Sequence, residues 1–388
     1  MNKEILNAFR LEGTVAEVKP LGNGLINDTY KVTTAEADRP DYVLHRINTY
    51  IFTDVEMLQR NIELVTGHIR KKMGLAPPSA PQKGATNVSE HDTNEAPFLG
   101  AVGGATSRHV LHFIPTHDGK TYHRDAAGQC WRVSVFIPNA VTLDEVTPET
   151  SYQAGRAFGE FEQMLSDLPE PLGCIIPDFH NMEFRMEQLR EAVKEDPLGR
   201  VRQVQDILNL YERDADRMCQ GERLFREGKL PRRICHCDPK VNNRMFDATT
   251  GEFLLVIDLD TVMPSLFFSD YGDFLRTAAN TTAEDDPNLD NVHFREDIFR
   301  SFTRGYVESV RPFFTPLEIQ LLPYAVELFP FMQSVRFMWA YILGNDYWKW
   351  NYPEHNLDRA RNQLRLYQEV CRHEPMMKNF IHQIISVL

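Results

Sequence analysis

The 388-residue sequence has no long hydrophobic run and no excess of basic residues. No apolar stretch approaches the roughly 20 residues that a membrane-spanning helix needs, and residues 1–7 lack the apolar centre of a secretory signal. We therefore expect a cytoplasmic protein with no membrane partner. The formal net charge of −13 argues against a nucleic-acid partner, because phosphate backbones are bound through clustered Lys and Arg.

Cysteine is also scarce, and its six positions are scattered. Only Cys235 and Cys237 lie near each other, and one intervening residue is not the usual spacing of a zinc-chelating pair. No second pair follows them. We expect reduced thiols, with neither a disulfide framework nor structural zinc.

Composition and length indicate a globular protein of more than one unit. Hydrophobic residues at 42% and charged residues at 25% are ordinary for a folded chain, so wholesale disorder is not expected. We place a first domain at 1–136 and a second at 137–388, because the composition changes from strand-forming to helix-forming near this point. No repeat and no specific signal for self-association is present, and we expect a monomer or a weak homo-oligomer.

The first third of the chain predicts a sheet and one helix. Strand-forming runs before and after Gly22-Asn23-Gly24 predict a hairpin whose tip exposes backbone N–H groups that can cover phosphates. Taken alone, this feature is better explained by an ordinary turn without a ligand. An amphipathic helix is predicted over 54–73, and a mobile surface loop over about 79–107. The predicted helix has an apolar stripe of Val55, Leu58, Ile62, Val65 and Ile69. Further strands are predicted at 42–47, 110–114 and 131–137.

Beyond Pro148 the pattern is mainly helical. Helices are predicted at 151–166, 182–193 and 201–226, and over long stretches from 294 onwards. Aromatic residues crowd the segment 329–350, where core packing is the simpler interpretation. Arg336 and Tyr347 are polar exceptions in that segment.

The most informative segment runs from His236 to Asn243 and is followed by Asp258. Transfer of a phosphoryl group mostly needs an acceptor held in line and negative charge neutralised. Asp238 can accept the proton of an acceptor hydroxyl, Lys240 can lie beside the phosphate, and Asn243 and Asp258 offer the oxygen ligands that magnesium prefers. A short apolar strand at 253–257 would place Asp258 at a strand end. The alternative is a satisfied histidine with solvated loop acids, which explains each residue singly but not the ordered set.

This pattern resembles the aminoglycoside phosphotransferase and choline kinase superfamily, and most closely the N-acetylhexosamine 1-kinases. The resemblance extends from about residue 21 to residue 366, apart from the segment near 79–107. It is carried by the segments 22–30, 42–48, 131–137, 236–243, 258–264, 269–276, 336–341 and 352–361.

The resemblance implies an α+β, bilobal, protein-kinase-like fold with an N-terminal antiparallel sheet lobe containing a helix and a larger, mainly helical C-terminal lobe. It also implies ATP and Mg²⁺ as cofactors and a small-molecule sugar as substrate. The implied residues are Asp238 and Lys240 for catalysis; Asn243 and Asp258 for the metal; Gly22, Asn23, Gly24, Asn27 and Arg46 for the nucleotide; and Asp238, Thr261, Arg336 and Tyr347 for the hexosamine. Asp270 resembles the acid that braces the catalytic loop, and Asp273 and Arg276 belong to the same motif.

Three features depart from the family pattern. Cys237 occupies the place usually held by Gly in a His-Gly-Asp loop. Where relatives have a basic residue over the phosphates, this chain has His45 and Arg46; we choose Arg46 because it is always charged. Its helix partner is left open between Glu56 and Glu63.

The function implied is phosphorylation of the anomeric 1-hydroxyl of an N-acetylhexosamine. The nearest alternative is the same chemistry on another small hydroxyl compound, such as an aminoglycoside, choline, ethanolamine or another sugar. A binding module without catalysis is less consistent with the sequence, because the three charged positions Asp238, Lys240 and Asp258 all remain. A protein kinase is less consistent too, because the chain has Asp258-Leu259-Asp260 in place of Asp-Phe-Gly and no Ala-Pro-Glu segment.

Overall fold

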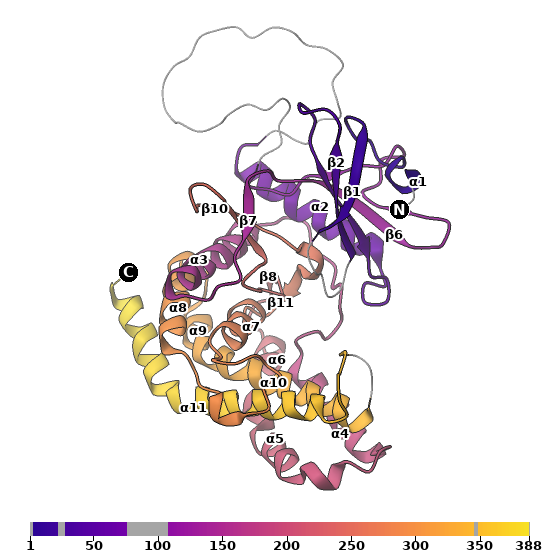
Figure 1. Cartoon of the computed structure of the whole chain (residues 1–388). Coiled ribbons are helices and arrows are strands. Elements are labelled where there is room, and N and C mark those ends of the chain that lie inside the picture. Colours follow the sequence, from indigo (N-terminus) through magenta and orange to yellow (C-terminus); the bar gives the residue numbers. More distant parts are fainter. Residues whose placement is uncertain (1–2, 22–27, 76–107, 345–347, 388) are drawn as a thin grey trace. The chain divides into compact units, whose positions relative to one another are not determined.

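An antiparallel sheet and a set of packed helices dominate two separate units of the chain (Figure 1). The structure is a computed structural model that describes residues 3–21, 28–75, 108–344 and 348–387. The first unit comprises residues 1–140 with 168–170, and the second comprises 141–167 with 171–388. In the described part, no helix has the length and apolar character that crossing a membrane requires.

The sheet of the first unit is antiparallel between all neighbouring strands. Its order is β1-β2-β3-β6-β4, and β5 also pairs with β6. The bounds are β1 (Val15–Pro20), β2 (Asp28–Thr34), β3 (Tyr42–Ile47), β4 (Phe113–Ile114), β5 (His123–Arg124) and β6 (Cys130–Val135). One face packs on an apolar cluster that includes Leu6 and Phe9, next to the short helix α1 (Lys3–Leu6). The strands predicted at 42–47 and 131–137 are thus present.

Helix α2 (Val55–Lys72) matches the helix predicted at 54–73. Asp54 caps its N-terminus by accepting a hydrogen bond from the Met57 backbone N–H. All five residues of the predicted apolar stripe are buried, as a 3.6-residue period requires when one face covers a core. The predicted hairpin tip and the predicted loop at 79–107 lie outside the described residues.

The second unit is mainly helical. Its helices are α3 (Pro148–Leu165), α4 (Met182–Glu195), α5 (Gln205–Met218), α6 (Gln220–Arg226), α7 (Phe268–Ala278), α8 (Glu296–Val310), α9 (Pro316–Gln320), α10 (Leu322–Leu343) and α11 (His355–Val387). The single helix predicted over 201–226 is wrong: a 3₁₀ turn at Val201–Val204 precedes α5, and the chain turns at Cys219 before α6. The aromatic-rich segment lies in α10 as far as Leu343, and this helix is buried on nearly all sides, so core packing is confirmed for that part.

Helices α3 and α8 lie side by side because glycines let their backbones approach (Figure 1). A Cβ atom on Gly155 of α3 would lie 2.1 Å from the Phe302 carbonyl oxygen of α8. A Cβ on Gly305 of α8 would lie 2.2 Å from the Tyr152 carbonyl oxygen of α3. Only residues without a side chain fit at these two positions.

Short strands carry the loops of the second unit. Strand β8 (Arg233–Cys235) pairs with β11 (Met263–Ser265), and β9 (Arg244–Asp247) pairs with β10 (Phe253–Val256) and with β7 (Ala140–Thr142). The segment 236–243 therefore runs from the end of β8 to the start of β9, and Asp258 follows β10. The predicted α+β class, with a sheet-containing N-terminal region and a mostly helical C-terminal region, is confirmed.

Candidate active site

His236 fixes the loop 236–243 to the end of β10. Its ring Nε2 lies 2.8 Å from the Ile257 carbonyl oxygen, which can only accept, so Nε2 carries the proton. Its Nδ1 then accepts from the Asp238 backbone N–H at 3.3 Å. The Ile257 N–H also donates to the Asn243 carbonyl oxygen at 2.9 Å. One buried imidazole thus sets the distance between the Asp238 backbone and the strand end that precedes Asp258.

Asp270 of α7 braces the first turn of the same loop. One carboxylate oxygen accepts from the His236 N–H and the other from the Cys237 N–H, both at 2.7 Å. Burial raises the pKa of the Asp270 carboxyl to about 6, although both backbone bonds favour its anion. This geometry fits the bracing role implied for Asp270.

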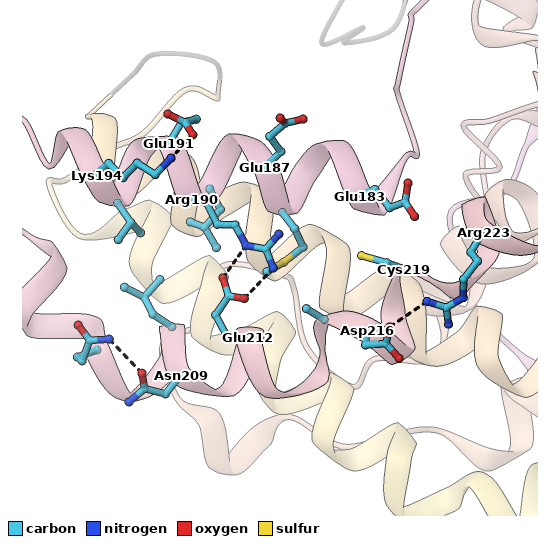
Figure 2. Close-up of a pocket in the computed structure, with 16 residues that line it drawn as sticks. Glu183, Glu187, Arg190, Glu191, Lys194, Asn209, Glu212, Asp216, Cys219 and Arg223 are labelled. Atoms are coloured by element: carbon cyan, nitrogen blue, oxygen red, sulfur yellow. Dashed lines mark hydrogen bonds and ion pairs between the residues drawn. The ribbon is translucent and has the colours of Figure 1, made fainter. Parts of the chain in front are cut away.

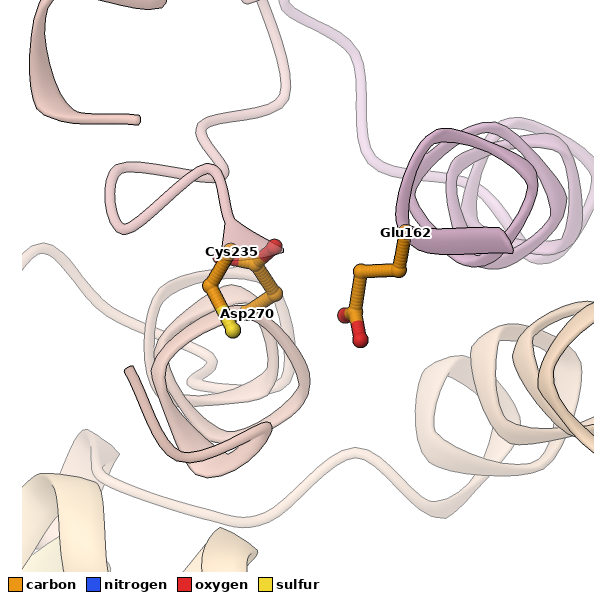
Figure 3. Close-up of side chains that lie close together, drawn as sticks. All are labelled: Glu162, Cys235 and Asp270. Carbon is orange, nitrogen blue, oxygen red and sulfur yellow. The ribbon is translucent and has the colours of Figure 1, made fainter. Parts of the chain in front are cut away.

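Asp270 lies in a buried group with Glu162 of α3 and Cys235 at the end of β8 (Figure 3). One ligand-type atom of each lies within 4.8 Å of the others. Both Asp270 oxygens already accept backbone hydrogen bonds, and Glu162 accepts one from the Tyr306 hydroxyl at 2.6 Å. Burial and the nearby Asp270 raise the pKa of Glu162 well above its ordinary value, which favours a protonated acid here. The arrangement is that of a core brace.

The loop 236–243, the end of β10 and the bracing Asp270 together form what we call the His236 frame. The proposed catalytic side chains lie on this frame. Lys240 Nζ lies 2.7 Å from an Asp238 carboxylate oxygen. Partial desolvation opposes the charge on Lys240, but Asp238, followed by Asp258 and Asp273, raises the pKa of its ammonium. The sequence pattern placed Asp238, Lys240 and Asp258 at one site, and they are electrostatic neighbours in the structure.

Asn243 and Asp258 supply oxygen atoms beside this group. The Asn243 side-chain N–H donates to the Asp238 carbonyl oxygen at 2.9 Å, which leaves the amide oxygen as the atom that can bind a cation. Asp258 is exposed and adopts a left-handed backbone conformation with φ of 59°. An amide oxygen and a carboxylate are hard donors of the kind that Mg²⁺ prefers, so these two residues fit a divalent cation.

Thr261 lies close to the loop but is buried. Its hydroxyl donates to the His236 carbonyl oxygen at 2.8 Å, and only 6% of the residue is exposed. A bond from Thr261 to a sugar remains a prediction.

Asp273 and Arg276 of α7 form an ion pair beside the loop. Arg276 Nε lies 2.7 Å from Asp273, and a second guanidinium nitrogen lies 2.8 Å from Glu284. Burial opposes the charge of Asp273, but Arg276 and then His180 lower the pKa of its carboxyl. Asp273 is therefore held as an anion between Arg276 and the Lys240 side chain.

Arg336 of α10 lies against aromatic rings. Its guanidinium carbon is 5.6 Å from the centre of the Phe179 ring and 5.2 Å from that of Trp348, and one nitrogen donates to Gln333 at 3.0 Å. Tyr347, the other predicted contact from this segment, lies outside the described residues.

In the first unit, Arg46 of β3 forms an ion pair with Asp28, its cross-strand neighbour on β2. His45 points to the opposite face of the sheet, since side chains alternate along a strand. Glu63 of α2 accepts a hydrogen bond from the Thr121 hydroxyl, and Glu56 lies exposed in the first helical turn. Asp28 is thus a partner that the sequence analysis did not consider. The predicted nucleotide contacts Gly22, Asn23, Gly24 and Asn27 lie outside the described residues.

Sequence analysis also missed Glu162. Its signal was available: in the predicted helix 151–166, the residue shares the apolar face of Phe158 and Leu165, where a carboxyl group has no reason to be unless it has a buried partner. Phe158 and Phe161 contact the His236 ring edge-on, so this helix also supports the loop by packing.

A separate cavity of about 960 Å³ lies along α4, α5 and α6, away from these residues (Figure 2). Arg190 of α4 and Glu212 of α5 are joined across it by two hydrogen bonds of 2.9 and 2.7 Å. None of the predicted site residues lines it. The chemistry of the loop 236–243, and not the size of this cavity, locates the candidate active site.

Comparison with known proteins agrees with this architecture. An aminoglycoside phosphotransferase from Alicyclobacillus acidocaldarius has a TM-score of 0.59 at 12% identity, covering 99% of this chain and 97% of its own. An amicoumacin kinase has 0.53 at 14%, covering 95% and 96%. An ethanolamine kinase from Plasmodium vivax has 0.51 at 11%, covering 96% and 84%. At these low identities, the TM-scores show a shared fold and nothing beyond it.

A sequence model of one family extends the comparison beyond fold. It matches residues 17–308, which include the whole loop 236–243, Asp258 and Asp270. The match covers well over half of the chain, and it includes every charged residue of the His236 frame. The chain belongs to the phosphotransferase enzyme family (APH).

Proposed function

We propose that this protein is an ATP-dependent small-molecule kinase that phosphorylates the anomeric 1-hydroxyl of an N-acetylhexosamine. The observation that carries the proposal is the His236 frame, which supports Asp238, Lys240 and Asn243 on one loop and Asp258 at the adjoining strand end. Among proteins of the same fold, the amicoumacin kinase structure contains AMP-PNP and Ca²⁺, which supports use of a nucleoside triphosphate and a divalent cation.

Asp238 is the proposed general base. Its carboxylate lies 2.7 Å from Lys240 Nζ and can accept the proton of the acceptor hydroxyl as that oxygen attacks the phosphorus. Lys240 would then contact the phosphoryl group in transfer as a positive point charge. The leaving group is the nucleoside diphosphate.

Asn243 and Asp258 are the proposed ligands of Mg²⁺. The cation supplies neutralisation of the negative charge on the phosphates. What the chain contributes is rigidity: the Asn243 backbone is bonded to Ile257, and its side chain is bonded to the Asp238 carbonyl oxygen. The two oxygen ligands and the base therefore move together.

In the first unit, we propose that the phosphates of the nucleotide are contacted by Arg46 and by Gly22, Asn23, Gly24 and Asn27. Arg46 would exchange or share its bond with Asp28 when a phosphate binds. Acceptor contacts are proposed for Thr261, Arg336 and Tyr347.

An acceptor panel tests the function most economically. Purified protein with ATP and Mg²⁺ is offered N-acetylglucosamine, N-acetylgalactosamine, glucose, choline, ethanolamine and an aminoglycoside, and ADP release and the phosphorylated product are measured. We expect the N-acetylhexosamines to give the highest kcat/KM, with phosphate on the anomeric oxygen. A preference for an ammonium-bearing acceptor would replace the sugar by the alternative substrates. If none of the acceptors raised ADP release above background, the kinase proposal would be overturned.

A further inference from the structure

The segment Asp178–Asn181, which precedes α4, is held in a single shape by its own hydrogen bonds. Asp178 has a left-handed backbone, with φ of 54°, and accepts from the Asn181 side chain at 2.8 Å. Asn181 caps α4 by accepting from the Phe184 backbone N–H at 3.2 Å. Arg185, one turn into α4, donates to the Phe179 carbonyl oxygen at 2.8 Å. Phe179 and His180 are therefore presented by a rigid turn.

The His180 ring is clamped between aromatic side chains. It stacks on Phe179 with centroids 4.2 Å apart and contacts the edge of Phe329 of α10 at 4.9 Å. Its Nδ1 lies 2.9 Å from the Ser269 hydroxyl oxygen, which in turn lies 2.7 Å from the Ser265 hydroxyl oxygen. Orientation of this imidazole is thus fixed by two rings and one hydrogen bond.

The other ring nitrogen, Nε2, has no hydrogen bond to any residue that the structure describes. Among the described residues, Ser269 is the only polar partner of the ring, and the residue is part-exposed. With Nδ1 fixed on Ser269, the second ring nitrogen keeps one direction in which it can form a hydrogen bond with a ligand.

His180 belongs to the charge environment of the candidate active site. Desolvation among the aromatic rings lowers the pKa of its imidazole to about 3, with Asp273 opposing and Arg336, Arg185 and Arg276 reinforcing the shift. The ring is consequently neutral at physiological pH. Asp273 also acts on the Lys240 ammonium, and Arg336 lies over the Phe179 ring, so the pair Phe179–His180 borders the side chains proposed for catalysis and for the acceptor.

We propose that His180 is a specificity-determining residue that hydrogen-bonds the acceptor through Nε2, with Phe179 and Arg336 beside it, and that this wall selects a neutral hydroxyl-bearing acceptor over an ammonium-bearing one. The inference rests on the proposed kinase function. A neutral imidazole can donate to or accept from a hydroxyl or amide, whereas the three arginines around it repel a second cation. Asp273 offsets part of this repulsion, although it is also paired with Arg276.

The test compares His180→Asn with wild type on N-acetylglucosamine and on glucosamine, a matched pair that differs in the acetyl group and in the charge it masks. Asparagine reaches Ser269 with its amide but has no atom at the Nε2 position. We expect KM for N-acetylglucosamine to rise about tenfold, as for loss of one bond to a neutral partner, with kcat and KM for ATP within about twofold of wild type. The preference for the neutral sugar should shrink correspondingly.

Two further variants separate binding from structure. His180→Gln can place its amide near the Nε2 position and should recover part of the lost affinity for the acceptor. His382→Asn, at an exposed position of α11, is the matched control and should match wild type in every constant. An unchanged acceptor KM in His180→Asn would overturn the inference, as would an equal loss for ATP and acceptor with a lowered melting temperature. Failure of the kinase proposal is distinguishable, since wild type itself would then release no ADP.

Discussion

Cys237 adopts a backbone conformation that favours glycine. Its φ is +63°, and it lies between His236 and Asp238, where Asp270 accepts the two consecutive backbone N–H groups at 236 and 237. The left-handed turn points both N–H groups toward one carboxylate. The thiol is buried, and burial raises its pKa well above the ordinary value, so it fills space as a small apolar group.

At this position two substitutions should have opposite consequences. Cys237→Gly removes the steric cost of positive φ but also the buried sulfur, and we expect the free energy of unfolding to change by under about 1 kcal/mol with activity retained. Cys237→Val adds a β-branched side chain to a left-handed residue and should cost about 2–3 kcal/mol. Urea unfolding and kcat of both variants check this. A valine variant as stable and active as wild type would show that the turn is not constrained.

Residue spacing could single out the proposed catalytic set because its members are close in sequence. Asp238, Lys240 and Asn243 occupy one loop, and a single apolar strand separates them from Asp258. Asp28 and His180 were not predicted. Their roles depend on strand register and on packing between distant segments, and a lone acid or histidine in the sequence carries no sign of either.

Among the elements, the contact between α3 and α8 depends most strictly on sequence. At Gly155 the nearest atom to an added Cβ would be a backbone oxygen of α8 at 2.1 Å, which cannot rotate away as a side chain would. Helix α3 also carries Glu162, Phe158 and Phe161, which contact the loop brace and His236. Separation of these helices would therefore disturb the candidate active site as well as the core.

We expect Gly155→Ala to destabilise the protein by about 2–3 kcal/mol, because the helices must move apart. Gly159→Ala should cost less, since its nearest neighbour is the Ser309 side chain at 2.7 Å. Gly67→Ala in α2 is the matched control: no atom lies within 4 Å of its added Cβ, and it should gain up to about 1 kcal/mol from helix propensity. Equal midpoints of thermal unfolding for the three variants would contradict this account of the contact.

Element prediction succeeded where periodicity was long and capped. The apolar stripe of α2, with Asp54 at its start, defined that helix to within one residue at either end. In the span 201–226, Gly221 was the one local signal near the break between α5 and α6, and a single Gly does not by itself end a helix. Strands such as β5 and β11, of two and three residues, are too short for any period to appear.

At the scale of the whole molecule, buried carboxyl groups link stability to pH. Glu162 lies in the core, and its folded pKa is raised well above its usual value by burial and by Asp270. Above pH 4.5 the unfolded chain releases this proton while the folded chain keeps it. Stability from this group is therefore fully present at low pH and falls as the pH rises toward the folded pKa, by up to about 1.4 kcal/mol per pH unit.

Glu162→Gln should remove that slope. The amide oxygen can still accept from the Tyr306 hydroxyl, but no proton is exchanged on unfolding. We expect the variant to be less sensitive to pH than wild type between about pH 5 and pH 8, and relatively more stable at the upper end. Urea unfolding of both proteins at about pH 5 and at about pH 8 provides the measurement. Parallel behaviour of the two proteins would mean that Glu162 titrates normally.

The overall class was predictable from the sequence because strand-forming and helix-forming segments occupy different parts of the chain. A sheet in the first 140 residues and helices after Pro148 follow from local patterns alone. The surroundings of the proposed acceptor contact Arg336 were not predictable in the same way, since its neighbour Phe179 comes from a distant segment that only the fold brings near it. The family match fixes the class of reaction and leaves the acceptor to experiment.

The most direct test of the central claim is the steady-state rate of phosphorylated acceptor formation by Asp238→Asn, with binding of the nucleotide measured on the same preparation. Asparagine keeps the shape of the side chain but cannot take the hydroxyl proton. We predict kcat to fall roughly 10²- to 10⁴-fold, with the Kd for ATP and the melting temperature close to wild type. A variant that turns over at the wild-type rate would contradict Asp238 as the base, and with it the phosphoryl-transfer site built on the His236 frame.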